Sequence, residues 1–112
     1  MKILGELKVG DPIYFIYYSD EGDCILSVKQ YTIAIITEIA IGHIIKWFDK
    51  NGDLHATTLL KEENESYITR AFYGCRMCAD LDFVINVVND DKKCQMKKYN
   101  KIIKELTNEN ES

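Results

Sequence analysis

A turn followed by a strand is encoded at residues 7–18, whose sequence is LKVGDPIYFIYY. Gly10 permits backbone angles that other residues avoid, and Pro12 fixes φ at the first residue of a strand. From Ile13 to Tyr18 every side chain is aromatic or β-branched, which is the composition that strands favour. Polar residues follow and end the strand as a loop. We therefore predict that the fold opens with a short strand.

Four more strands follow from the same composition and from the turn residues between them. The Asn51-Gly52 pair is the strongest short-range hairpin signal, because both residues tolerate the positive φ of a tight turn. Gly74 ends the last strand. The four predicted strands are residues 30–40, 43–48, 54–60 and 67–73.

The end of the chain is predicted to be helical over residues 76–106. Residues 76–89 fit both a helical and an alternating pattern, and we interpret them as helix. Asn89, Asp90 and Asp91 are the expected cap of a further helix. Its apolar positions fall on one stripe, which we expect to cover the sheet. They are Met96, Tyr99, Ile102, Ile103 and Leu106.

These elements predict an α+β fold, with a small five-stranded antiparallel β-barrel followed by a C-terminal helix or helices. Residues 1–112 would form a single domain, with the barrel at 7–73 and the helical segment at 76–106. The opening residues 7–14 and the Asn-Gly hairpin resemble those of Src-homology-3-like and KOW-type small barrels. They are also similar to short phage or mobile-element proteins built on that opening. The resemblance covers residues 7–73 and implies binding rather than catalysis.

Charge is distributed unevenly along the 112 residues. The net charge is −4, but residues 1–91 carry eight basic and fifteen acidic side chains, a net charge of −7. Residues 92–104 carry six lysines and no acidic residue. The start of the chain is too polar for a signal peptide, and its most apolar stretch is too short to span a membrane. We expect a cytoplasmic protein without a membrane partner.

The four cysteines leave three interpretations open. Cys75 and Cys78 form a Cys-x-x-Cys pair, whereas Cys24 and Cys94 stand alone, so a zinc site would lack its second pair. A redox disulfide would need a strand-to-helix junction at Cys75. The third interpretation is packed, reduced thiols, with Cys94 exposed. We expect the third, with no metal and no cofactor.

Catalysis has no support in the sequence. His43 and His55 fall on adjacent predicted strands, where they could face each other, but no nucleophile or acid-base set accompanies them. Phosphate-loop and hydrolase motifs are also missing. We therefore expect that the protein is not an enzyme.

Two groups of residues are candidates for binding. Neighbouring strand residues face opposite ways, so some of the many aromatic side chains must lie outside the barrel, either under the helical segment or free for a partner. The aromatic candidates are Tyr14, Tyr18, Trp47 and Phe48. The second group is a basic helix face consisting of Lys93, Lys97, Lys101 and Lys104.

The expected function is that of a non-catalytic intracellular binding module that docks onto a protein partner. The phage-like resemblance would extend this to an inhibitor of a host protein. The alternative is nucleic-acid binding, in which the lysine-rich helix contacts phosphates and exposed aromatic side chains stack on bases. A homodimer is also possible, because a small barrel can hide surplus aromatics and open edges by self-association.

Overall fold

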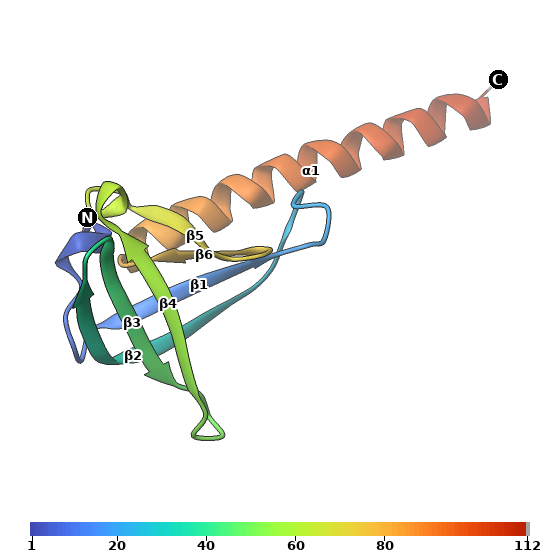
Figure 1. The fold of residues 1–112 in the computed structure, drawn as a ribbon. Helices are drawn as coiled ribbons and strands as arrows, with labels where there is room; N and C mark the ends of the chain where they lie inside the picture. Colours follow the sequence, from blue (N-terminus) through green and yellow to red (C-terminus); the bar gives the residue numbers. More distant parts are fainter. Residues whose placement is uncertain (112) are drawn as a thin grey trace.

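The chain forms one curled antiparallel sheet with a long helix against its outer face (Figure 1). The computed structural model describes residues 1–111, with side chains as far as residue 108. The strands are β1 (Pro12–Tyr18), β2 (Ile25–Ile39), β3 (Gly42–Phe48), β4 (Leu54–Leu60), β5 (Ile68–Phe72) and β6 (Cys75–Cys78). The helices are the short 3-10 turns η1 (Leu4–Glu6) and η2 (Lys61–Glu63), and α1 (Leu81–Glu111).

The sheet curls into a half-barrel. Its strand order is β4-β3-β2-β1-β6-β5, and every neighbouring pair is antiparallel. β2 is long enough to pair with β1 along its first half and with β3 along its second. The two outer strands meet where Oγ1 of Thr57 in β4 donates to the carbonyl of Ala71 in β5 at 3.4 Å. The predicted α+β class is confirmed.

Alternation along the strands divides the apolar side chains between two cores. On β1, Ile13 and Phe15 point into the curl, where they pack with Trp47 and Met77. The other face of β1 carries Tyr14 and Ile16, which pack beneath α1 with further side chains. Period-two alternation therefore gives this sheet one face for the half-barrel and one for the helix.

The prediction of five strands is wrong, because Cys75–Cys78 forms a sixth strand instead of starting a helix. β6 lies between β1 and β5 and pairs with both. Hydrogen bonds on both sides, together with burial of three of its four side chains, favour the extended conformation over a helical turn. The predicted second strand also begins earlier than expected, at Ile25 instead of Gln30.

A single helix replaces the two predicted helical pieces. Its cap is Asp80, whose Oδ1 accepts the backbone N–H of Phe83 at 3.2 Å. Oδ2 of the same carboxylate accepts the backbone N–H of Lys2 at 2.7 Å, and these hydrogen bonds hold the pKa of Asp80 below its usual value. The expected cap at Asn89–Asp91 is wrong, since these residues lie inside α1. Among the described residues, no helix is both long and apolar enough to cross a membrane.

Candidate interaction surface on the C-terminal helix

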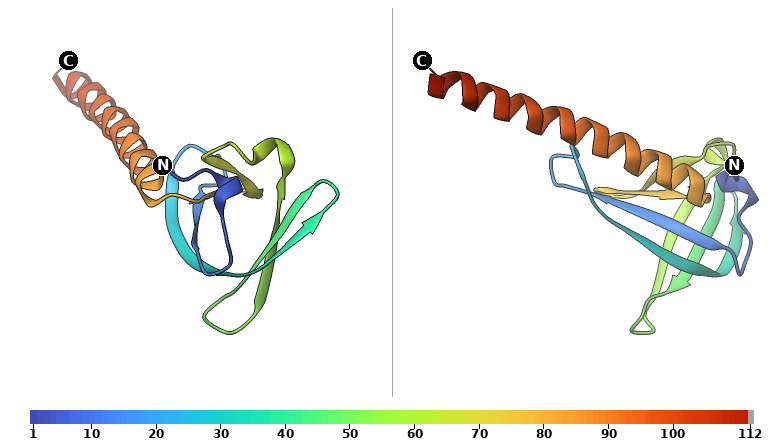
Figure 2. Two further views of the ribbon diagram at one scale, coloured as in Figure 1. Left: turned by 90° about the vertical axis from the view of Figure 1, so that its left-hand side faces the viewer. Right: turned by 180° about the vertical axis from the view of Figure 1, so that it is seen from behind.

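Helix α1 has a near half that lies along the sheet and a far half that projects from it (Figure 2). The last links to the body are made to the β1–β2 loop. Nε2 of Gln95 donates to the carbonyl of Asp23 at 2.9 Å, and Nζ of Lys98 lies 3.5 Å from an Asp23 carboxylate oxygen. Beyond Lys98 the helix extends away from the sheet, so the molecule measures 64 × 31 × 22 Å.

A few side chains pack the near half of α1 against the sheet. Val84 is buried against Tyr14, Ile16 and Cys78 of the sheet. Phe83 stacks on Tyr67, with ring centroids 5.4 Å apart. These contacts occupy one side of α1 and leave its neighbouring side uncovered.

An apolar stripe runs along that uncovered side for most of the helix. Its members lie at helical spacings on one side of α1, with a gap of eight residues between Val88 and Met96 in which Lys92 occupies the same side. Each is between 37% and 60% exposed. The apolar stripe consists of Leu81, Ile85, Val88, Met96, Tyr99, Ile102, Ile103 and Leu106.

We expected from the sequence that the stripe would cover the sheet. In the structure it does not. Tyr99 is 57% exposed on the projecting half, where no strand lies against it. The sheet is instead covered by residues on a neighbouring side of the helix, chiefly Phe83, Val84 and Val87. The projecting half of α1 therefore presents an apolar surface that nothing within the described part of the chain covers.

The predicted basic face is on the other side of the projecting helix. Lys93, Lys97, Lys101 and Lys104 are all exposed. Among residues 1–108, whose side chains the structure describes, ion pairs join Lys2 to Asp11, His55 to Asp49 and Lys98 to Asp23, and none involves these four lysines.

The four aromatic candidates separate into buried and exposed residues. Trp47 is only 2% exposed inside the half-barrel, and Tyr14 is 6% exposed beneath α1. Both are core residues in this fold, because strand alternation turns Trp47 into the half-barrel and Tyr14 towards the helix. The expectation that they form part of a binding surface is therefore wrong. Tyr18 is half-buried beside Arg76, and Phe48 is 53% exposed at the end of β3.

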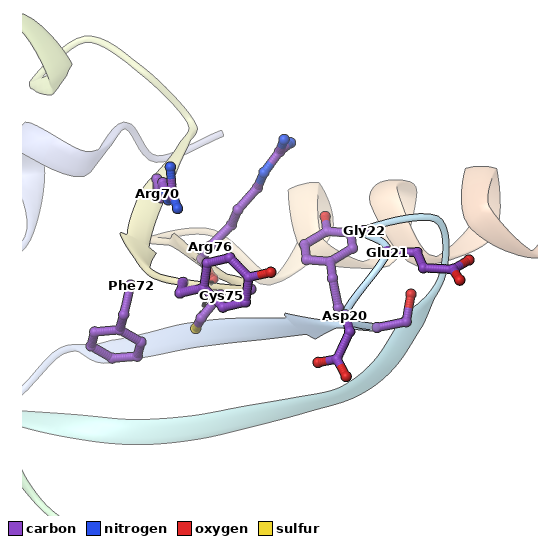
Figure 3. Close-up of a pocket in the computed structure, with 11 residues that line it drawn as sticks. Asp20, Glu21, Gly22, Arg70, Phe72, Cys75 and Arg76 are labelled. Carbon is purple, nitrogen blue, oxygen red and sulfur yellow. Dashed lines mark hydrogen bonds between the residues drawn. The ribbon is translucent and has the colours of Figure 1, made fainter.

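An arginine pair is a surface feature that the sequence analysis missed. Arg70 and Arg76 are directly opposite each other on β5 and β6, and the Arg76 guanidinium lies 5.4 Å from the centre of the Tyr18 ring. They line an open pocket of about 360 Å³ (Figure 3). The carboxylates of Asp20 and Glu21 lie across this opening and point away from both guanidiniums. The sequence did contain a signal for this pair, because the only two arginines of the chain lie on either side of Gly74.

The cysteines are all free, and three of them are at least partly covered. Burial raises the pKa of the Cys75 thiol to about 11 and that of Cys78 to about 12. The neighbouring Arg76 opposes the shift at Cys78 without cancelling it. Cys94 is exposed, as predicted. In the described part of the chain, no three His, Cys, Asp or Glu side chains are grouped so that they could hold a metal ion.

The two histidines do not face each other. His43 is opposite Leu59, whereas His55 is opposite Trp47 near the other end of the same strand pair. His55 stacks on the Trp47 ring, and its Nε2 lies 2.7 Å from Oδ2 of Asp49. This hydrogen bond lowers the pKa of the Asp49 carboxyl. The pair stabilises the β3–β4 turn and is not accompanied by a nucleophile.

Comparison with other proteins returns no relative. No protein-family model matches the chain, and no curated protein or solved structure is significantly similar to it. The resemblance of residues 7–73 to small Src-homology-3-like barrels therefore stays a prediction.

Proposed function

We propose that this chain is a non-catalytic protein-interaction module that docks through the apolar stripe of α1. The observation that carries the proposal is the uncovered run from Met96 to Leu106 on a helix that has already left its own sheet. Large apolar and aromatic side chains grouped on one exposed side are typical of interaction sites.

The projecting half also needs a partner for its own stability. It extends for about three and a half turns beyond Lys98 and includes Asn100, Thr107 and Asn108, which are weaker helix formers. The far half continues from the near half and needs no nucleation of its own, but in water helix propagation through such residues is only marginally favourable. Packing of an apolar side supplies the stability that the isolated segment lacks.

A protein is a better occupant of the stripe than an anionic membrane surface. The lysines of α1 would favour anionic lipid, but the body from residue 1 to 91 carries a net charge of −7 and would be repelled. Packing against another protein needs no such approach of the acidic body to anionic headgroups.

Affinity capture with matched variants tests the proposal. The tagged chain serves as bait. It is incubated with a cell lysate to which untagged copies of the same chain have been added, and the retained proteins are identified. Ile103→Glu places a charge on the stripe, whereas Asn100→Glu introduces the same residue on the polar side of the same turn. We expect the wild type and Asn100→Glu to retain the same protein and Ile103→Glu to lose it. Capture that is unaffected by Ile103→Glu would contradict the proposal.

A second candidate function is nucleic-acid binding by the lysine face. It is favoured by the four exposed lysines, which make no ion pair within the described residues. Binding to mixed oligonucleotides should then fall steeply with salt, because phosphate contacts release counterions. The double change Lys97→Glu and Lys101→Glu should abolish binding, while Lys50→Glu with Lys61→Glu is the control of equal charge. Absence of binding at low salt would remove this candidate.

A further inference from the structure

We propose that the protein that docks on the apolar stripe is a second copy of this chain, whose α1 packs antiparallel to the first. The inference rests on the proposed function, because it uses the same stripe and names its occupant. It is supported by the spacing along α1, by the distribution of charge and by the extent of the uncovered surface.

Spacing along the helix matches the far half of one copy to the near half of the other. A twofold axis beside Gln95 and Met96 places Leu106 against Ile85 of the second copy, because these residues lie at equal distances from the axis. The same register places Ile103 against Val88 of the second copy. Three- and four-residue spacings alternate on both halves, as interlocking antiparallel helices require. One symmetric contact thus covers both halves of the stripe.

Lys92 is the one charged residue in the middle of the stripe, and the antiparallel register gives it a suitable neighbour. Tyr99 of the second copy lies at the matching distance from the axis. A lysine can cover apolar surface with its stem, and its ammonium is attracted to an aromatic face. The interruption of the stripe at Lys92 is therefore compatible with the contact.

Charge favours the antiparallel over the parallel arrangement. Antiparallel packing places the lysine-rich residues 97–104 beside residues 87–94 of the second copy, where Asp90 and Asp91 balance Lys92 and Lys93. Parallel packing would instead align lysines with lysines and set two bodies of charge −7 side by side.

The uncovered surface is large enough for such a dimer. Scaled by their exposed fractions, the eight side chains of the stripe offer on the order of 800 Å² per copy, which is about what each partner of a standard interface buries. The far half projects past the body, and on the near half Leu81, Ile85 and Val88 are between 37% and 51% exposed, so both halves of the stripe are open to a second helix.

The mass of the purified chain in solution is the first test, measured by light scattering after gel filtration over a wide range of concentration. We expect twice the chain mass for the wild type and for Asn100→Glu, and the single chain mass for Ile103→Glu. Fluorescence of Trp47, which is buried in the body away from the far half, verifies that each variant is folded. A folded wild type that stays monomeric at every concentration would overturn the inference.

Cysteine cross-linking tests the orientation. In a Cys94→Ser background, Val88→Cys and Ile103→Cys are combined in one chain or introduced singly. On one helix these positions are about 22 Å apart, too far for a disulfide within a chain. Mild oxidation with diamide should give covalent dimers only from the double variant or from a mixture of the two single variants. Covalent dimers formed by either single variant alone would indicate parallel packing and overturn the inference.

Failure of this inference is distinguishable from failure of the proposed function. A monomeric wild type that captures a different protein, with loss of capture by Ile103→Glu, overturns the dimer and leaves the docking function in place. A monomer that captures nothing through the stripe overturns both. Stripe-dependent sedimentation of a monomer with vesicles of anionic lipid also overturns both.

Discussion

The burial of Cys75 and Cys78 shows how one residue spacing is compatible with different chemistries. A Cys-x-x-Cys pair occurs in metal sites, redox sites and packed cores. The sequence favours packing because a second pair is missing and because predicted strands, with no helix among them, precede the motif. The structure adds a physical reason to expect these thiols to be unreactive. Cys75 lies inside the half-barrel and Cys78 beneath α1, where burial disfavours the thiolate.

Thiol labelling should therefore be strongly selective. We expect Cys94 to react first with a thiol reagent near neutral pH, because it is exposed and has lysines nearby in sequence. Cys75 and Cys78 should react only at the rate of unfolding. Mass spectrometry of the labelled peptides over time measures the order. Labelling of Cys75 as fast as Cys94 would contradict the burial of the pair.

Alkaline pH should destabilise the fold through the same two thiols. Their folded pKa values of about 11 and 12 lie above the ordinary value of 9.0, so the unfolded chain loses protons first as pH rises. The contribution of these two thiols to the unfolding free energy should be constant up to about pH 9 and then decrease until about pH 12. Denaturant titrations at increasing pH measure this decrease, which should be shallower for Cys78→Ala. Tyr17 contributes in the same direction, since burial raises its pKa to about 12.

At the scale of single elements, the predictable strands are those whose pattern and turn agree. The strands on either side of Asn51-Gly52 were predicted correctly, because alternation and turn chemistry both act locally there. β6 was not predictable in this way, since its conformation depends on pairing with β1 and β5. A four-residue strand carries too little local pattern to outweigh a helical periodicity that continues into α1.

The β2–β3 turn depends on Gly42 more than on any other feature of its sequence. Gly42 has φ of +156°, and a Cβ at this position would lie 2.0 Å from the carbonyl oxygen of Leu59 on β4. Gly42→Ala should thus lower the unfolding free energy by more than about 2 kcal/mol, because backbone atoms must move.

Gly52→Ala is the matched control for that change. Gly52 also has positive φ, at +82°, but a Cβ there meets nothing within 4 Å. It should cost about 1 kcal/mol, from backbone strain alone. Thermal or denaturant unfolding of the two variants measures the difference. If both variants lose the same unfolding free energy, the backbone of β4 does not approach Gly42 as closely as the structure shows.

At the scale of the whole molecule, the position of the far half of α1 is the feature that sequence reasoning could not supply. The stripe from Met96 to Leu106 and the opposite lysine face were both identified from periodicity, and the structure has both on one helix. Periodicity shows that a helix has an apolar side but not what that side contacts. The assignment to the sheet was wrong because Val84 and its neighbours already occupy the sheet, and a straight helix then carries the stripe beyond it.

The central claim is that the stripe of the projecting helix is covered by another copy of the chain, and amide hydrogen exchange tests it most directly. A helix of this length with no covering partner should exchange almost freely, because its hydrogen bonds open by fraying. We predict protected amides over residues 99–108 in the purified wild type, with protection that increases with protein concentration and is lost in Ile103→Glu. Free exchange of these amides in the wild type at every concentration, with the sheet still protected, would contradict the account.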